Sequence, residues 1–166
     1  MIATIGYEKA NLDHFLGSLQ KAKVEIVVDI RDRAQSRRRG FSKSALSDAL
    51  ASVGIGYMHI KELGDPKPGR DAARSGDFKT FKKIYRAVLE TPQAKESLNR
   101  LEKLGRTNNV CLLCYERDQS TCHRKIVSDI LEVRLDSKAV HLGVQPIEPS
   151  FAERGRVFHS RQSAAA

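Results

Sequence analysis

The chain has 166 residues, of which 40% are hydrophobic and 30% are charged, and its formal net charge is +9. This composition fits a single globular domain that is large enough to bury a core, and no apolar stretch is long enough to cross a membrane. The three cysteines are unevenly spaced, and the N-terminus begins directly with a predicted strand. Both features argue against a secreted, disulfide-bonded protein and predict a cytoplasmic one.

Apolar runs rich in β-branched residues predict the strands of a sheet. Four of the runs are well defined and a fifth is weaker; in chain order they lie at residues 2–5, 25–30, 56–60, 110–114 and 139–144. Between them, apolar residues recur at helical spacing. These patterns predict helices at residues 12–19, 46–53, 77–89, 91–105 and 121–134.

Capping residues support these helices. Asn11, Asp77 and Thr91 stand where N-caps belong, and Gly54 and Gly105 stand where the second and fourth helices are expected to end. Residues 61–76 hold two prolines and three glycines. We expect this stretch to be a long mobile loop that acts as a lid over a site.

The alternation of strands and helices predicts right-handed crossovers and a mostly parallel sheet. The expected fold class is therefore α/β, with a sheet of four to five strands and helices on both faces. We expect one domain over residues 1–145. Residues 146–166 lose the periodicity, and we expect a loosely ordered tail there.

Polar residues gather where the predicted strands end. The carboxyl ends of parallel strands meet at one edge of the sheet, outside which ligands bind. Each residue taken alone also has a structural interpretation, such as a turn glycine or an ion-paired aspartate, and it is their convergence that favours a site. In chain order these candidates are Gly6, Tyr7, Asp29, Arg31, Ser36, Arg37, Tyr57, His59, Cys114 and Glu116.

A dense block of positive charge follows the second predicted strand. Residues 31–43 hold six basic residues against one acid, Asp32. A solvated loop is the alternative interpretation of such a block. Charge of this density favours contact with an anion, such as a phosphate or a nucleic acid backbone.

The segment from Cys114 to Arg124 places two thiols, a carboxylate, an imidazole and a guanidinium between the fourth strand and the last helix. Cys122 and His123 stand at the N-terminal end of that helix. The partial positive charge there acidifies a thiol, and together with Arg124 it holds an anion.

Three interpretations of this segment stay open. In the first, Cys114, Cys122 and His123 bind zinc, with Glu116 or His59 as a fourth ligand. In the second, one of the two thiols is a nucleophile and the imidazole is its base. In the third, the thiols only pack, while the carboxylate, the imidazole and Arg124 bind substrate.

Spacing narrows these alternatives. Cys111 and Cys114 are three apart on a strand, so they point to opposite faces, and Cys111 is predicted to be a core residue. The C-x7-C-H spacing is not that of a standard zinc finger, and adjacent Cys and His ligands fit a helix poorly. Nine residues separate Cys114 from Arg124, which is too many for the loop of a cysteine phosphatase.

Several blocks of the sequence, in order, resemble the family described as "domain of unknown function 488". Thr4-Ile5-Gly6-Tyr7, Asp29-Ile30-Arg31, Ser36-Arg37 and Phe41 are similar to its opening. Residues 54–59 with Leu63-Gly64 resemble its middle block, and residues 113–116 and 122–124 resemble its C-terminal signature. Members usually carry a proline where this chain has Ala34-Gln35. The resemblance implies a small α/β domain and the same site residues, and it implies no function.

Together these features predict an enzyme that acts on a nucleotide or nucleic acid, by hydrolysis or transfer at a glycosidic or phosphate bond. Arg31, Arg37, Arg38, Arg39 and Arg124 would neutralise phosphates. Asp29 and Glu116 would act as nucleophile or base, and His123 and His59 would move protons. Tyr7 and Tyr57 would stack on a base or act through their hydroxyl groups. We expect an anionic partner, no membrane and no cofactor other than zinc in the first interpretation. The alternatives are a non-catalytic nucleic-acid-binding module and a zinc-stabilised structural domain.

Overall fold

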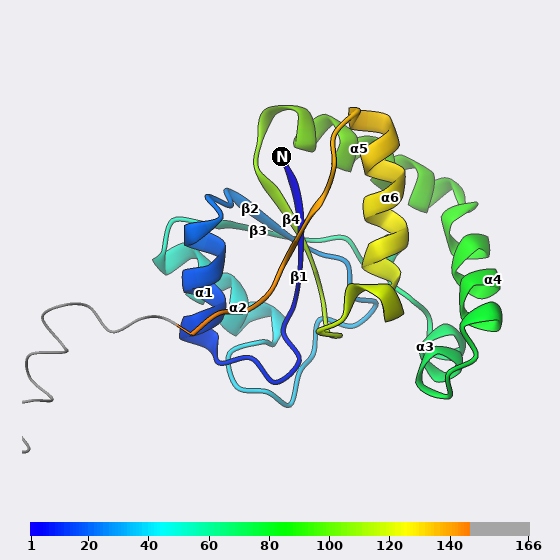
Figure 1. The fold of residues 1–166 in the computed structure, drawn as a ribbon, viewed down its shortest axis with the longest axis horizontal. Coiled ribbons are helices and arrows are strands. Elements are labelled where there is room, and N and C mark those ends of the chain that lie inside the picture. The colour runs from blue at the N-terminus through cyan, green and yellow to red at the C-terminus, as the bar shows by residue number, and fades with distance from the viewer. Residues whose placement is uncertain (147–166) are drawn as a thin grey trace, which may run out of the picture.

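The computed structural model describes residues 1–146, which form a five-stranded parallel sheet between two layers of helices (Figure 1). The sheet has the order β3-β2-β4-β1-β5. Its strands are β1 (Ile2–Gly6), β2 (Ile26–Asp29), β3 (Gly56–His59), β4 (Val110–Cys114) and β5 (Val140–Leu142). The predicted α/β class and all five predicted strands are confirmed. The tail expected from residue 146 lies, apart from its first residue, outside the described part of the chain.

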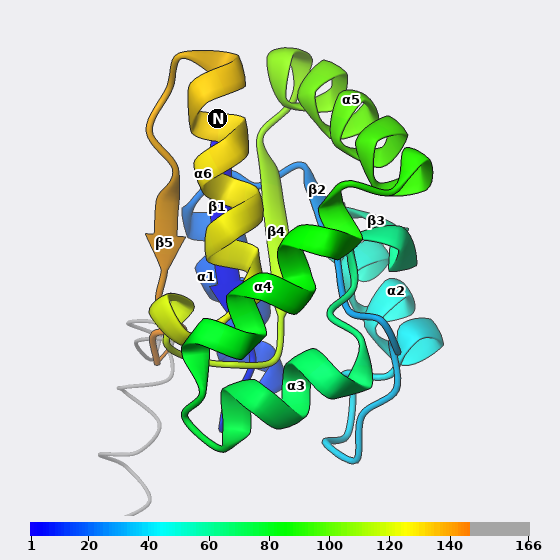
Figure 2. The same ribbon diagram turned by 90° about the vertical axis from the view of Figure 1, so that its right-hand side faces the viewer.

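Helices cover both faces of the sheet (Figures 1 and 2). On one face lie α1 (Leu12–Lys21) and α2 (Lys43–Ser52), and on the other lie α4 (Phe78–Leu89), α5 (Pro92–Thr107) and α6 (His123–Leu135). Each layer encloses its own apolar core. Side chains of adjacent residues on a strand point to opposite faces, so Leu112 joins the core under α4 to α6 while Cys111 joins the core under α1 and α2.

The predicted caps account for the helix boundaries. The side chains of Asn11, Asp77 and Thr91 accept hydrogen bonds from backbone N–H groups in the first turns of α1, α4 and α5. Gly54, with φ of +75°, follows α2 as expected. Gly105 does not end α5, which continues to Thr107; a Cβ there would lie 2.7 Å from Ile2 Cδ1, so this glycine lets the helix approach β1 closely.

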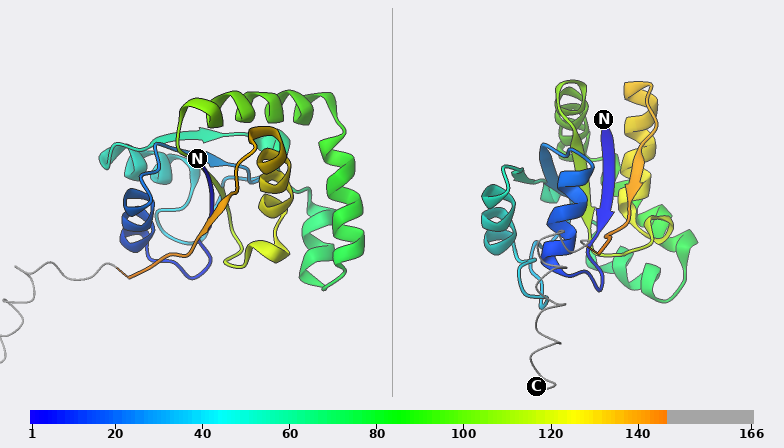
Figure 3. Two further views of the ribbon diagram at one scale, coloured as in Figure 1. Left: turned by 45° about the horizontal axis from the view of Figure 1, so that its top comes forward. Right: turned by 60° about the vertical axis from the view of Figure 1, so that its left-hand side comes forward.

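The expectation of a long mobile loop at residues 61–76 is wrong. A short 3-10 turn (Lys61–Leu63) leads into a further helix, α3 (Lys67–Arg74), which lies beside α4 (Figure 3). The prolines favour this helix, because Pro66 is its N-cap and Pro68 stands in its first turn, where no N–H partner is needed. Gly76, with φ of +80°, forms the turn between α3 and α4.

The topology opens a crevice at the carboxyl end of β4. The chain leaves β1 and β2 towards α1 and α2, whereas it leaves β4, which lies between those two strands, towards α6 on the opposite face. Connections that diverge in this way leave room for a ligand outside the strand ends. Among residues 1–146, no helix combines the length and the apolarity that a membrane span requires.

Candidate functional site

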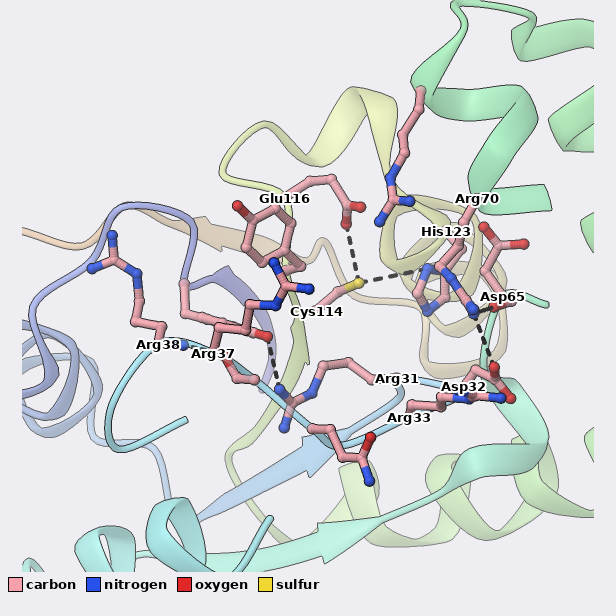
Figure 4. A pocket seen from close by; sticks show the side chains of 15 residues that line it. Arg31, Asp32, Arg33, Arg37, Arg38, Asp65, Arg70, Cys114, Glu116 and His123 are labelled. Carbon is pink, nitrogen blue, oxygen red and sulfur yellow. Dashed lines mark hydrogen bonds and ion pairs between the residues drawn. The ribbon is translucent and has the colours of Figure 1, made fainter. Parts of the chain in front are cut away.

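A cavity of about 920 Å³ lies at this carboxyl edge of the sheet. Its walls come from the segments that follow β1, β2, β3 and β4, and from α3. Figure 4 shows Arg37 and Arg38 on one side and Arg70 on the other, with Cys114, Glu116 and His123 between them. A volume in the range of small-molecule sites makes this cavity the candidate functional site.

The predicted site residues divide into two groups. Seven line the cavity, namely Tyr7, Arg31, Ser36, Arg37, Cys114, Glu116 and His123. The other six, which do not line it, are Gly6, Asp29, Tyr57, His59, Cys122 and Arg124. The polar residues at the strand ends therefore indicated the edge of the sheet at which the cavity lies, but they did not separate the residues that face the cavity from those that support it.

Asp29 and Arg31 form a buried ion pair at the end of β2. The guanidinium donates from Nε to Asp29 Oδ1 at 2.8 Å and from NH2 to Oδ2 at 2.5 Å. The hydroxyl of Tyr57 donates to the same carboxylate at 2.7 Å, and the NH1 of Arg31 donates to the hydroxyl of Tyr7 at 2.8 Å. Burial would lower the pKa of Arg31, but the hydrogen bonds and the charge of Asp29 raise it. This network holds the strand ends in place, and most of its polar side-chain atoms already have a hydrogen-bond partner within it.

Three further predicted residues shape the backbone around the cavity. A Cβ on Gly6 would lie 1.8 Å from the carbonyl oxygen of Glu116, so only glycine allows the segment after β4 to pass over β1. The buried Arg124 donates to that same carbonyl and, at 3.0 Å, to the carbonyl of Arg117. His59 forms a hydrogen bond with the carbonyl of Arg31 at 2.8 Å.

The two thiols and the imidazole of the C-terminal segment meet at the cavity floor. His123 Nδ1 lies 3.6 Å from Cys114 Sγ and 3.9 Å from Cys122 Sγ, and the three ligand atoms all fall within 4.8 Å of one another. All three residues are buried. Cys122 has an extended backbone, with φ of −124° and ψ of 144°, and only His123 is helical, so the two neighbours can point to one place. The objection that adjacent ligands fit a helix poorly does not apply.

Glu116 lies next to this cluster. The Cys114 thiol donates to Glu116 Oε2 at 3.1 Å. Burial would raise the pKa of Glu116, but hydrogen bonds from the thiols of Cys122 and Cys114 lower it. Burial raises the pKa of both thiols, so burial by itself keeps them protonated.

Asp65 is a cavity residue that the sequence interpretation missed. It is 4% exposed, and its Oδ1 has no hydrogen-bond partner among the described residues. Burial raises its pKa to about 6. Its carboxyl group lies against Gly69, where a Cβ would be 2.0 Å from Oδ1. The sequence held a signal for this residue, because Asp65 lies in the segment that follows the end of β3.

Arginine is the commonest residue of the cavity lining, which includes Arg31, Arg33, Arg37, Arg38, Arg70 and Arg74. The last two belong to α3 and were missed because that helix was expected to be a loop. Arg70 pairs with Asp32 at 2.9 Å. Within residues 1–146, no carboxylate lies within 4.0 Å of Arg33, Arg37 or Arg38. The cavity wall therefore carries positive charge that the described protein does not neutralise. Arg39, in the same block, is exposed and does not line the cavity.

Comparisons with known proteins agree with the resemblance in the sequence. No curated protein and no solved structure matches the chain. A family model, described as "Domain of unknown function DUF488", matches residues 11–131. That match spans β2, β3, β4 and most of the cavity lining. The chain therefore belongs to the DUF488 family.

Proposed function

We propose that the protein is an enzyme that binds a phosphate-bearing substrate, a nucleotide or a nucleic acid end, in the arginine-lined cavity. The observation that carries the proposal is the set of three arginines, Arg33, Arg37 and Arg38, that line the cavity without a carboxylate partner among the described residues. Guanidinium groups bind phosphate oxygens through paired hydrogen bonds. The reaction class we assign is hydrolysis or transfer at a phosphate or glycosidic bond.

The arginines of the cavity take different roles in this proposal. Arg37 and Arg38 are exposed on the cavity wall, and they provide the main phosphate contacts. Arg31 uses Nε, NH1 and NH2 to hold Asp29, Tyr7 and the carbonyl of Phe41, so it positions the wall. Arg70, which bonds to Asp32, stands on the opposite side.

Tyr115 supports a nucleotide rather than a simple phosphate. This residue is 47% exposed although it lines the cavity, and its ring packs edge-on against Tyr7 at 5.3 Å between centroids. Tyr7 is stacked on Phe41 at 4.6 Å. An exposed aromatic ring that is held in place by others offers a surface on which a base can stack.

Two carboxyl groups supply the proton transfer. Asp65 has a pKa raised to about 6, so it holds a proton part of the time near neutral pH and suits a general acid. Glu116, beside Cys114, also lines the cavity and acts as the base that takes a proton from the attacking hydroxyl or water. Two carboxyl groups whose surroundings shift their pKa values in opposite directions suit opposite roles, one as acid and one as base.

The test combines binding with turnover. Nucleoside mono-, di- and triphosphates and short oligonucleotides are titrated by calorimetry, and the products are followed by chromatography. We expect the double variant Arg37→Ala/Arg38→Ala to lose at least ~10-fold in affinity, since each charge-assisted bond contributes about 1.5–3 kcal/mol. Arg39→Ala is the matched control, and its affinity should not change. Asp65→Asn and Glu116→Gln should still bind the ligand but lose turnover.

Two results would contradict the proposal in different ways. Equal affinities of the Arg37→Ala/Arg38→Ala and Arg39→Ala variants would remove the cavity as the phosphate site. Tight binding of a ligand by the wild-type protein, with no product from any member of the panel, would leave a non-catalytic binding module instead.

A further inference from the structure

We propose that Cys114, Cys122 and His123 bind one Zn²⁺ ion at the floor of the cavity. Tetrahedral zinc has Zn–S bonds of about 2.3 Å and Zn–N bonds of about 2.0–2.1 Å, so its ligand atoms lie roughly 3.5–3.8 Å apart. The distances from His123 Nδ1 to the two sulfurs are 3.6 and 3.9 Å. All three atoms lie within 4.8 Å of one another. The two distances between nitrogen and sulfur are therefore already close to those of a zinc site, and the two sulfurs are at most 4.8 Å apart.

The orientation of His123 is the second observation. Its Nε2 lies 2.8 Å from the carbonyl oxygen of Ile30, which can only accept a hydrogen bond, so Nε2 carries the proton. Nδ1 is therefore the ring nitrogen that faces the two thiols, and in the neutral ring it carries the lone pair that a metal requires. Histidines that bind a metal through one ring nitrogen usually donate the N–H of the other to a backbone carbonyl or a carboxylate.

The ligands stand on rigid elements. Cys114 is the last residue of β4, Cys122 is the N-cap of α6 and His123 is the first residue of that helix. The ring of His123 also packs against Tyr85, at 5.1 Å between centroids, and the hydroxyl of Tyr85 donates to the carbonyl of Leu63 at 2.6 Å. Ligands fixed in this way bind a metal with little loss of side-chain freedom.

Three protein ligands leave a fourth position. Cys114 and His123 line the cavity, whereas Cys122, which is 2% exposed, does not, so the cluster meets the cavity on one side. Catalytic zinc sites keep such a position for water or substrate. Glu116 lies next to it, with Oε2 3.1 Å from Cys114 Sγ. Placing a substrate oxygen at the fourth position rests on the proposed function, whereas zinc binding itself does not.

His59, considered above as a fourth ligand, is excluded from this site. Its Nε2 is bonded to the carbonyl of Arg31, and it is not part of the ligand cluster among the described residues. Cys111 points into the core on the other face of the sheet. It is therefore a matched control, because it is a buried thiol of β4 outside the cluster.

The experiment begins with metal content. The protein is purified without chelator and without nickel affinity resin, and zinc, iron, copper and nickel are measured by elemental mass spectrometry. We expect about one zinc per chain. After removal of the metal, Co²⁺ is titrated, and the thiolate-to-cobalt absorption reports the ligands directly. We expect saturation at one equivalent with a tetrahedral spectrum, a result that needs no variant.

Variants then assign the ligands. Cys122→Ala should lower the affinity for Co²⁺ by at least ~100-fold, since it removes one of three protein ligands. Cys111→Ala should keep one equivalent and the same spectrum. Circular dichroism of both variants shows whether they are folded. A folded Cys122→Ala variant with unchanged metal affinity, or equal losses in both variants, would overturn the assignment.

Two other outcomes of the wild-type protein would also overturn it. The first is no metal at saturating Co²⁺, with all three thiols titratable after denaturation. The second is a Cys114–Cys122 disulfide as the native state, detected by peptide mass spectrometry. The inference and the proposed function fail separately, because Arg37→Ala/Arg38→Ala should bind zinc normally. Zinc without phosphate binding would keep this site and remove the proposed function.

Discussion

Two buried polar clusters lie at the same edge of the sheet, and they differ in how completely their bonds are used. At the end of β2, Asp29 accepts four hydrogen bonds, three from Arg31 and one from Tyr57. At the ends of β3 and β4, Asp65 has an oxygen with no partner among the described residues, and His123 directs Nδ1 at two thiols. The first cluster is complete within the protein, whereas the second has room for a ligand.

A buried ionisable residue at a strand end is therefore not enough to indicate a site. A buried charge that is fully hydrogen-bonded is held in one geometry and has nothing left to bind. A buried carboxyl oxygen without a partner reduces stability, and such groups concentrate at functional sites. Three aspartates at this edge make the comparison testable. Asp29 is fully hydrogen-bonded, Asp65 has an oxygen without a partner within residues 1–146, and Asp32 is in a partly exposed ion pair.

The largest effect is expected at Asp29. Changing it to asparagine keeps the shape but removes the charge that compensates the buried guanidinium of Arg31. Breaking a buried ion pair on one side lowers the free energy of unfolding by about 3–5 kcal/mol. Urea denaturation, followed by circular dichroism, measures the change. A loss below about 1 kcal/mol would mean that this pair behaves like a surface one.

Asp65 should respond in the opposite direction. Its folded pKa is raised to about 6, so its contribution to stability is present at low pH and is lost as the pH rises through that value. Asp65→Asn removes this loss, so the variant should be more stable than the wild type by about 1–3 kcal/mol at pH 8 and nearly equal to it at pH 4.

Charged neighbours also affect the pKa of Asp65. The charges of His123 and Arg70 lower its pKa, and those of Glu116 and Asp32 raise it, although burial is the larger effect. Denaturation midpoints of both proteins at several pH values give the difference. An Asp65→Asn variant that is less stable than the wild type at pH 8 would show that the carboxylate is paired, which would contradict the contrast with Asp29.

The smallest effect is expected at Asp32. Its side chain is 39% exposed and that of its partner Arg70 is 29% exposed, so water screens the pair. Asp32→Asn should lower the free energy of unfolding by about 0.2–1 kcal/mol, and less at high salt. Denaturation at low and high ionic strength tests this. A loss as large as that of Asp29→Asn would place the pair in the buried class.

The fold was predictable from the sequence to a large extent, because its signals are local. Apolar runs located the five strands, and capping side chains at Asn11, Asp77 and Thr91 located three helix starts. The exception was α3, where prolines and glycines suggested a loop. Proline in the first turn of a helix is favourable, so the same residues that break a helix interior begin this one.

The candidate site was only partly predictable. The sequence determined which edge of the sheet holds the reactive groups, since parallel strands bring their carboxyl ends together. It also placed Cys111 in the core and Cys114 on the other face, because side chains alternate along a strand. These conclusions depend only on the parallel direction of the strands and on the alternation of side chains along each strand.

Which of these groups already have hydrogen-bond partners within the protein depends on the tertiary structure. Arg31 bonds to Asp29 and Tyr7, although Arg37, in the same basic block, lines the cavity without a carboxylate partner among the described residues. The tertiary structure also brought Asp65 to the cavity and set His123 between two thiols. Whether two residues far apart in the chain form a bond depends on their distance and orientation in the folded protein. The local pattern of the sequence does not determine either of these.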